Sequence, residues 1–328
     1  MHYGTRSQNS SAKLFPPNTV LVAMYGATIG ACSILPYAAT SNQACAAFLP
    51  TPDVLPDYLY YFLCSKKEQF VKDGVGGAQP NISASYLKNV EMQVPSLQEQ
   101  HVIIAVLNKA QELISLRKQQ IAKLDELVKA RFVEMFIGKG YPTKTIDEVS
   151  RAKGEYGAQS ASAEYDPARP RYVRITDIND DGTLNDDVVA SSNITDDEQY
   201  RLEYGDFMFA RMGATVGKTY AFIKGNQIFA GYLIRYKLKC ELVNPHYLFW
   251  YTRLDEYWNW VKLNQSGAAQ PGINAKKFGS LQIPLPPIEE QNAFATFVAQ
   301  TDQQKLTMQH SLAQLELLKK ALMQKYFG

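Results

Sequence analysis

The sequence predicts an α+β fold in which two mixed α/β globular domains are joined by two long antiparallel coiled-coil helices. First, a long helical pattern at 96–137 recurs at 287–328. Second, shorter motifs that precede each helix recur in the same order, 187 to 191 residues apart. Third, these motifs lie among short runs of β-forming residues. Self-similarity at a fixed period indicates a tandem duplication.

The first long helix has clear signals at both ends. Ser96 followed by Glu99 is typical of a capping box, and Gly138 and Pro142 end the pattern. Apolar residues recur at a spacing of seven at Leu107, Ile114, Ile121 and Val128. This spacing predicts a coiled-coil seam. About 40 residues at ~1.5 Å each give a helix of roughly 60 Å.

The second long helix repeats the first without a gap. Pro286, Glu290 and Gln291 stand where Pro95, Glu99 and Gln100 stand in the first copy. Lys305 takes the place of Ile114, a polar interruption of a kind that can set helix register. Two helices of equal length with similar seams are expected to pack antiparallel.

The globular parts repeat three shorter motifs. The turn at 26–30 recurs at 213–217, the helix start at Pro56 recurs at Pro245, and the glycine-rich loop at 74–82 recurs at 265–274. We therefore assign 1–95 to the first domain and 142–286 to the second. By this match the first domain is expected to lack about 45 residues of its N-terminal part. Val90–Val94 alternates apolar and polar residues and predicts an edge strand.

Composition limits the class of protein. The 328 residues are 46% hydrophobic and 20% charged, as in soluble globular proteins. The net charge is +2, so a nucleic-acid binder would need its basic residues concentrated on one surface. No apolar run reaches 18 residues, and the first residues have no secretory pattern. The four cysteines form no C-x-x-C pair, which predicts thiols in a reducing cytoplasm and no metal site.

Two motifs suggest catalysis but do not support it. The run 212–219 has the Lys-Thr end of a phosphate-binding loop, but Met212 stands where that loop needs glycine. The alternatives are a tight turn, or a turn whose amides and Lys218 approach a phosphate. Asn244 and Pro245 are similar to an adenine-methyltransferase motif, but the first copy has Leu55 in place of the asparagine. We predict no catalytic residue.

Several polar and basic residues could contact nucleic acid. Amides in the glycine-rich loops could bind base edges or phosphates, or the loops could be purely structural. Lys276 and Lys277 add positive charge beside the second loop. Arg169, Arg171 and Arg174 with Tyr156 form the densest basic-aromatic group, although charges at a strand edge also serve solubility.

Taken together, these motifs resemble the specificity (S) subunit of Type I restriction-modification systems. The resemblance covers almost the whole chain and rests on the Gly-Ala-Thr-x-Gly turn, the Gly-x-Ala-Gln-Pro loop and the Pro-x-x-x-Glu-Gln helix start, each present twice. It implies two target recognition domains, each reading one half of a bipartite site in double-stranded DNA. It also implies spacer helices that dock two methyltransferase (M) subunits.

The resemblance has further implications. The chain would be non-catalytic, with S-adenosylmethionine on the partner methyltransferase. A restriction-translocase (R) subunit would join for cleavage, and the complex would be cytoplasmic. The shortened first domain leaves open whether another polypeptide completes it. An alternative function is a non-catalytic protein-binding scaffold built from the repeat. The residues expected to contact DNA are Tyr25, Thr28, Gln79, Asn81, Tyr156, Arg169, Arg171, Arg174, Arg211, Thr215, Lys218, Gln270, Asn274, Lys276 and Lys277.

Overall fold

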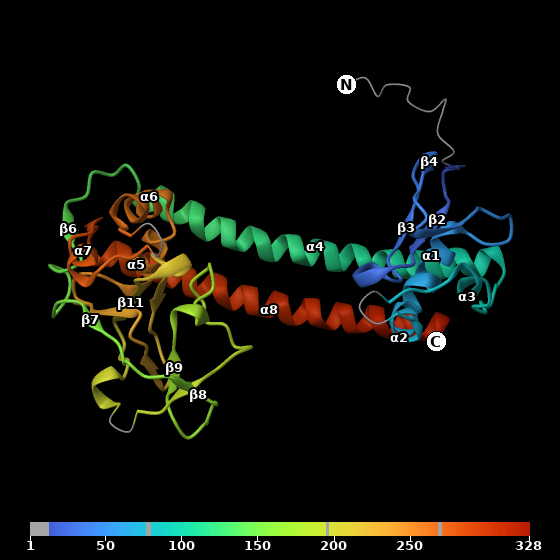
Figure 1. The fold of residues 1–328 in the computed structure, drawn as a ribbon. Coiled ribbons are helices and arrows are strands. Elements are labelled where there is room, and N and C mark those ends of the chain that lie inside the picture. The colour runs from blue at the N-terminus through green and yellow to red at the C-terminus, as the bar shows by residue number, and fades with distance from the viewer. Residues whose placement is uncertain (1–12, 77–79, 195–196, 268–270) are drawn as a thin grey trace. The chain divides into compact units, whose positions relative to one another are not determined.

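The computed structural model describes residues 13–76, 80–194, 197–267 and 271–328. The chain forms two compact units. Unit 1 comprises 1–122 and 306–328, and unit 2 comprises 123–305. Each unit therefore contains a globular part and one end of each long helix (Figure 1). The mixture of helices and strands in each globular part confirms the predicted α+β class.

The two long helices are α4 (Leu97–Phe136) and α8 (Ile288–Phe327), each of 40 residues. The predicted capping box at the start of α4 is present: Glu99 Oε2 accepts a 2.9 Å hydrogen bond from the Ser96 N–H, and the Glu99 N–H donates to Ser96 Oγ at 3.3 Å. Just beyond α4, Gly138 adopts a φ of +73°, a conformation that ends the helix because residues with a Cβ rarely adopt it.

Within each unit the two helix ends run antiparallel. In unit 1, Leu107 near the start of α4 shares a core with Phe327 at the end of α8. In unit 2, Phe132 near the end of α4 packs on Phe294 near the start of α8, with ring centroids 5.2 Å apart. Lys305, the predicted polar interruption, forms a 2.7 Å ion pair with Asp125 of α4. The antiparallel pairing predicted from the sequence is confirmed within each unit.

Unit 2 is built around an antiparallel four-stranded sheet in the order β12 (Thr219–Ala221), β11 (Asp206–Ala210), β14 (Leu233–Lys237) and β7 (Glu155–Tyr156). All five residues of the central strand β11 are buried, in agreement with its apolar run from Phe207 to Ala210. Buried residues of β11 form one hydrophobic core with residues of helices α5 (Pro245–Tyr251), α6 (Asp255–Asn264) and α7 (Ala275–Gly279).

Shorter strand pairs complete unit 2. β9 (Arg171–Val173) pairs in parallel with β13 (Gln227–Phe229). β8 (Ser162–Ala163) pairs with β10 (Ser191–Ser192), and β6 (Thr143–Thr145) pairs with β15 (Gln282–Pro284), both antiparallel.

Unit 1 repeats the centre of unit 2 on a smaller scale. Its three-stranded antiparallel sheet has the order β3 (Cys32–Ile34), β2 (Val20–Ala23) and β5 (Cys45–Phe48). Helices α1 (Pro56–Ser65), α2 (Lys67–Asp73) and α3 (Ala84–Lys88) follow, and β1 (Leu14–Phe15) pairs with β4 (Ala39–Thr40).

One predicted strand is wrong. Val90–Val94 forms no strand, whereas its repeat counterpart, β15, does. β15 is a strand because β6 pairs with it. Among the described residues no strand lies against 90–94, so the alternating pattern there has no backbone partner.

Candidate nucleic-acid interface

In both units the Gly-Ala-Thr turn lies directly against the glycine-rich loop. The Gly26 N–H donates to the Pro80 carbonyl at 2.9 Å, and the Gly213 N–H donates to the Pro271 carbonyl at the same distance. All four glycines that bracket the two turns have positive φ, between +63° and +89°. This conformation accounts for the glycines and supports the tight-turn interpretation.

Hydroxyl groups close the two turns in the same way. Thr28 Oγ1 donates to the Tyr25 carbonyl at 3.2 Å, and Thr215 Oγ1 donates to the Met212 carbonyl at 3.1 Å. The structure therefore brings together, within each unit, the turn and the loop that sequence analysis selected separately. Segments about 50 residues apart meet because the residue that follows the strand before each turn also bonds to the loop. The Ile273 N–H donates to the Arg211 carbonyl at 3.0 Å, and the Ile82 N–H donates to the Met24 carbonyl at the same distance.

In unit 2 this junction carries a stacked arginine. The Arg211 guanidinium lies 4.9 Å from the ring centre of Tyr156 and 5.7 Å from that of Tyr232. Both tyrosines are exposed, at 43% and 55%. Arg211 Nε donates to the Gly231 carbonyl at 3.2 Å, which helps to hold the guanidinium near both rings. The arrangement presents a cation and two aromatic faces, all suited to phosphates or bases.

Helix α7 adds two lysines to this junction. Asn274 Oδ1 accepts a 2.9 Å hydrogen bond from the Lys277 N–H and so caps the helix, and the Ala275 N–H donates to the Tyr156 hydroxyl at 3.2 Å. Lys276 and Lys277 are exposed, and neither forms an ion pair with any described residue. Their charge is therefore available to an anionic partner.

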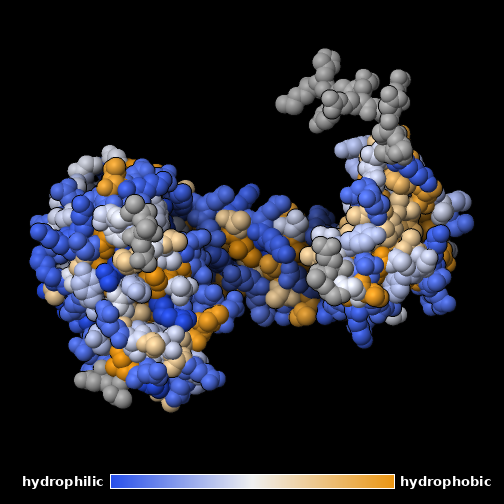
Figure 2. All heavy atoms as spheres, in the orientation of Figure 1, coloured by the Kyte–Doolittle hydropathy of each residue, from blue (hydrophilic) through white to orange (hydrophobic). Residues whose placement is uncertain are grey.

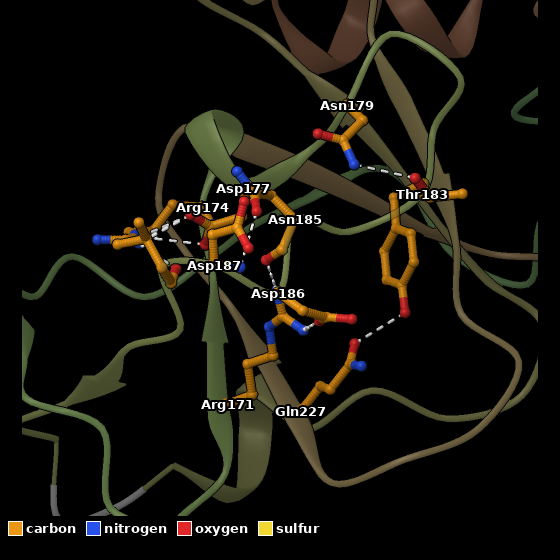
Figure 3. Close-up of polar contacts among 11 residues, drawn as sticks. Arg171, Arg174, Asp177, Asn179, Thr183, Asn185, Asp186, Asp187 and Gln227 are labelled. Carbon is orange, nitrogen blue, oxygen red and sulfur yellow. Dashed lines mark hydrogen bonds and ion pairs between the residues drawn. The ribbon is translucent and has the colours of Figure 1, made fainter. Parts of the chain in front are cut away.

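The arginines near β9 that were predicted to contact DNA form ion pairs within the unit. Arg171 Nη1 pairs with Asp186 at 2.6 Å, and Arg174 Nη2 pairs with the buried Asp177 at 2.7 Å, as Figure 3 shows. Arg174 Nε also donates to both oxygens of Asp177, at 3.1 and 3.0 Å. Hydrogen bonding to Asp177 raises the pKa of the Arg174 guanidinium above its usual range. Both arginines thus have internal partners within the strand region around β9.

Two more basic residues also bond within the fold. Arg169 Nη2 donates to the Ile194 carbonyl at 2.7 Å. Lys218 forms a 2.7 Å ion pair with Asp180 and donates to the Ile178 carbonyl at 3.1 Å. Contact of either side chain with a phosphate would require it to give up or share these bonds.

Unit 1 has the same frame with different side chains. Tyr25 forms a backbone bridge with Asn81, as Met212 does with Gly272. By repeat position, Arg211 corresponds to the buried Met24, and Lys276 and Lys277 correspond to Ser85 and Tyr86. The cations of unit 2 are therefore replaced by uncharged residues. Gln79 and Gln270 lie outside the described residues.

The sequence as a whole matches one protein family. The family described as "Type I restriction modification DNA specificity domain" matches residues 3–126 and 139–317. The chain belongs to this family. Its two matched segments correspond to the two copies of the internal repeat, in agreement with the resemblance inferred from the motifs.

Two relatives in Methanocaldococcus jannaschii carry specificity-subunit names. The chain is 27% identical to the Type I restriction enzyme MjaIX specificity subunit over 50% of its own length and 43% of that protein. It is 24% identical to the putative MjaX specificity subunit over 82% of its own length and 66% of that protein. The chain thus spans less than two thirds of these two relatives.

The fold of this family member also matches solved structures. A chain from a study of the structural basis of complex assembly and conformational transition of the type I R-M system aligns with a TM-score of 0.66, at 18% identity. The alignment covers 98% of this chain and 84% of that chain. At this identity the likeness shows the fold, in which two globular parts alternate with two long helices.

Sequence reasoning missed one residue of the unit 2 junction. Tyr232 completes the arginine stack, but it follows Gly231 in a loop before β14 and carries no motif. A tyrosine directly after a glycine and before a β-forming run was the available signal. Within the described ranges, no group of three His, Cys, Asp or Glu side chains could hold a metal ion, and no helix could span a membrane.

Proposed function

We propose that this chain is the DNA sequence-recognition subunit of a Type I restriction-modification complex. The observation that carries the proposal is the junction of turn and glycine-rich loop, built with the same backbone bonds in both units and given different side chains. A common frame with divergent side chains is what reading two different half-sites requires. Family membership and the specificity-subunit names of the relatives support it.

In unit 2 the DNA contacts centre on Arg211, Lys276 and Lys277, with Tyr156 and Tyr232 beside them. These cations are exposed or stacked at the surface, where a backbone phosphate or a guanine edge could reach them. Arg171, Arg174 and Lys218 contribute by holding the β9 region and the 178–187 loop in place, because their charges already have acidic partners.

In unit 1 the contacts are polar and uncharged. Tyr25 is 48% exposed at the equivalent junction, and Asn81 pairs with it through the backbone. Aromatic and amide groups can contact base edges or stack, but they add little sequence-independent attraction to phosphates. Unit 2 therefore supplies most of the electrostatic affinity.

The long helices dock the methyltransferase subunits. In unit 1, α4 exposes Val102, Val106 and Leu113, and α8 exposes Leu306, Leu317 and Leu318. Large apolar side chains on the solvent side of a helix are typical of a protein-binding surface. The chain itself is non-catalytic and holds no cofactor. Methyl transfer from S-adenosylmethionine belongs to the partner, cleavage belongs to an R subunit, and the complex works in the cytoplasm.

A gel-shift assay tests this function. The chain is mixed with its partner methyltransferase and with DNA fragments that carry or lack sites methylated in cells that express it. We expect sequence-dependent binding that requires the methyltransferase. Complex formation with the methyltransferase but no sequence-dependent DNA binding would instead favour the protein-binding scaffold.

A further inference from the structure

Unit 1 contains an open hollow of about 770 Å³ beside the end of α1. Residues of α2 and of the unit 1 parts of α4 and α8 also line it. Figure 2 shows hydrophobic and moderately hydrophobic residues gathered over the strands of unit 1, whereas most residues that line this hollow are polar or charged. The basic lining residues are Lys66, Lys67, Lys118, Lys319 and Lys320, and the acidic ones are Glu68 and Glu316. This excess of positive charge attracts anions.

The positive charge of the hollow is only partly neutralised. Lys118 forms an ion pair with Glu316 at 2.9 Å. Lys67 and Lys320 are exposed, and neither forms an ion pair in the part of the chain that the structure describes. The charges of these two lysines are therefore available to an anionic ligand.

A pair of thiols lies at the edge of this hollow. Cys64, near the end of α1, lines the hollow and is partly exposed. Its sulfur shares a hydrogen bond with the thiol of Cys32, the first residue of β3. Cys32 Sγ also donates to the Gly30 carbonyl at 3.4 Å. A Cβ built on Gly30 would lie 3.0 Å from Lys67 Cγ, so the turn that leads to β3 packs directly on the start of α2. This packing holds the two thiols beside each other.

The same two positions also meet in unit 2. By strand register and repeat position, Cys32 corresponds to Thr219 and Cys64 corresponds to Arg253. Arg253 Nη1 donates to Thr219 Oγ1 at 3.0 Å. The two backbone positions are therefore neighbours in both units, and in unit 1 both of them carry thiols.

The surroundings of Cys64 favour its thiolate. Hydrogen bonding from Cys32 lowers the pKa of Cys64 to about 7, although burial acts in the opposite direction. The Tyr60 hydroxyl and the positive charges of Lys319 and Lys67 add to the lowering of this pKa. Hydrogen bonding to Cys64 and burial raise the pKa of Cys32, so Cys64 ionises first and Cys32 keeps its proton. A thiol whose pKa lies near the ambient pH is the most effective attacking group in thiol–disulfide exchange.

We propose that this hollow binds a low-molecular-weight disulfide that carries carboxylates, and that Cys64 and Cys32 undergo thiol–disulfide exchange with it. Lys67 and Lys320 bind the carboxylates through charge-assisted hydrogen bonds, and Cys64 meets the disulfide bond at the edge of the hollow. Unit 1 is then a site of reversible thiol oxidation. Its two thiols stay reduced where small thiols prevail and form a disulfide where the small disulfide accumulates.

The exchange takes place in two steps. The Cys64 thiolate attacks one sulfur of the small disulfide, whose S–S bond breaks, so that a mixed disulfide forms at Cys64 and one small thiolate leaves. Cys32 passes its proton to that thiolate and attacks Cys64 Sγ, which forms the Cys32–Cys64 disulfide and releases the second small thiolate. The two protein thiols together lose two electrons. The small disulfide gains these electrons and leaves as two thiols, which also take up the protons of Cys32 and Cys64.

Mass spectrometry of the full chain tests the exchange without DNA or a partner protein, so its outcome is independent of the proposed function. The chain is incubated with glutathione disulfide at neutral pH, and the remaining thiols are alkylated at intervals. We expect a disulfide between Cys32 and Cys64, and a mixed disulfide at Cys64 that accumulates in the Cys32→Ser variant. Cys45, a partly exposed thiol that does not line the hollow, is the matched control and should react at least about threefold more slowly than Cys64. Absence of the Cys32–Cys64 disulfide, or equal reaction rates of Cys45 and Cys64, would overturn the proposal.

Charge variants test the hollow itself. The measured quantity is the ratio of the exchange rate with glutathione disulfide, which is anionic, to the rate with cystamine, which is a cationic disulfide. Lys67→Gln combined with Lys320→Gln should lower this ratio at least about threefold, because the two lysines attract only the anion. Lys88→Gln combined with Lys139→Gln removes the same charge from exposed positions outside the hollow and should leave the ratio unchanged. An unchanged ratio for the first variant, or an equal decrease for both, would show that the hollow does not bind the anion and would overturn the site.

Discussion

Gln100 of α4 and Gln291 of α8 make the same three hydrogen bonds in the two units. Each side-chain oxygen accepts from the backbone N–H that precedes a helix proline, that of Leu55 at 2.8 Å and that of Asn244 at 2.9 Å. Each side-chain nitrogen donates to two backbone carbonyls, one of them the proline five residues before it. Both side chains are 0% exposed. The glutamines therefore fasten each long helix to the start of a shorter one.

We expect Gln291→Leu to lower the free energy of unfolding by about 2–4 kcal/mol, because three backbone groups in a buried site lose their partner. Urea unfolding followed by circular dichroism measures the change. Gln98→Leu, on the exposed first turn of α4, is the matched control and should leave stability unchanged within about 0.5 kcal/mol. Equal stability of the two variants would show that these repeated hydrogen bonds add no net stability.

The stacked Arg211 leads to a prediction on DNA affinity. Arg211→Ala should weaken binding of target DNA, in the presence of the methyltransferase, by about 1–3 kcal/mol if the guanidinium meets a base edge. Lys276→Ala and Lys277→Ala should instead reduce affinity for all sequences and lower the slope of log K against log salt by about 1 each. Fluorescence anisotropy at several salt concentrations separates these effects.

The control for this series is Lys139→Ala, an exposed lysine in the turn after α4. Equal losses for Lys139→Ala and Lys276→Ala would mean that net charge matters and the junction does not. Tyr232→Ala is expected to resemble Arg211→Ala, because the ring supports the guanidinium at 5.7 Å.

The Arg174–Asp177 pair leads to a prediction on folding. Arg174→Ala leaves the buried carboxylate of Asp177 without its guanidinium partner, so we expect a loss of stability of about 1–3 kcal/mol. DNA affinity, measured well below the melting temperature, should change much less than for Arg211→Ala. Asp177→Asn should lower stability too, since it removes the same ion pair. A variant Arg174→Ala with unchanged melting temperature and weakened DNA binding would instead place this arginine in the interface.

Sequence analysis could predict the repeat, the long helices and their caps because these depend on local patterns. The period of seven, the capping box and the glycine turns are all visible within a few residues. It could not predict pairing between distant segments. Val90–Val94 carries a strand pattern, but strand formation depends on a partner, which β15 has and this segment lacks.

The same limit applies to the site. The density of arginines at 169–174 favoured a DNA-binding patch, but acidic residues up to 15 positions away pair with Arg171 and Arg174. Arg211 belongs to no cluster of arginines in the sequence, and it gains its environment from Tyr156 in β7 and Tyr232 in the loop before β14. Charge counts along the chain do not show which cations have already been neutralised.

His246 at the start of α5 gives a prediction on pH. Burial lowers the pKa of its imidazole, and the charge of Asp302 acts weakly in the opposite direction. The folded state therefore favours the neutral ring. In the unfolded chain the ring has its ordinary pKa of about 6.5. Below this pH the unfolded state binds more protons, so stability falls as pH decreases from about 6.5 through the lowered pKa of the folded state.

Replacing the ring should remove this dependence. We expect the free energy of unfolding of the His246→Gln variant to change less between about pH 7 and 5.5 than that of the unmodified chain. The carboxyl of Asp302, whose pKa is raised chiefly by burial, changes stability in the opposite sense, because its folded state binds more protons than its unfolded state. His310→Gln, exposed on α8, is the matched control. If the His246→Gln variant gave the same pH profile as the unmodified chain and as His310→Gln, protonation of His246 would not be coupled to folding.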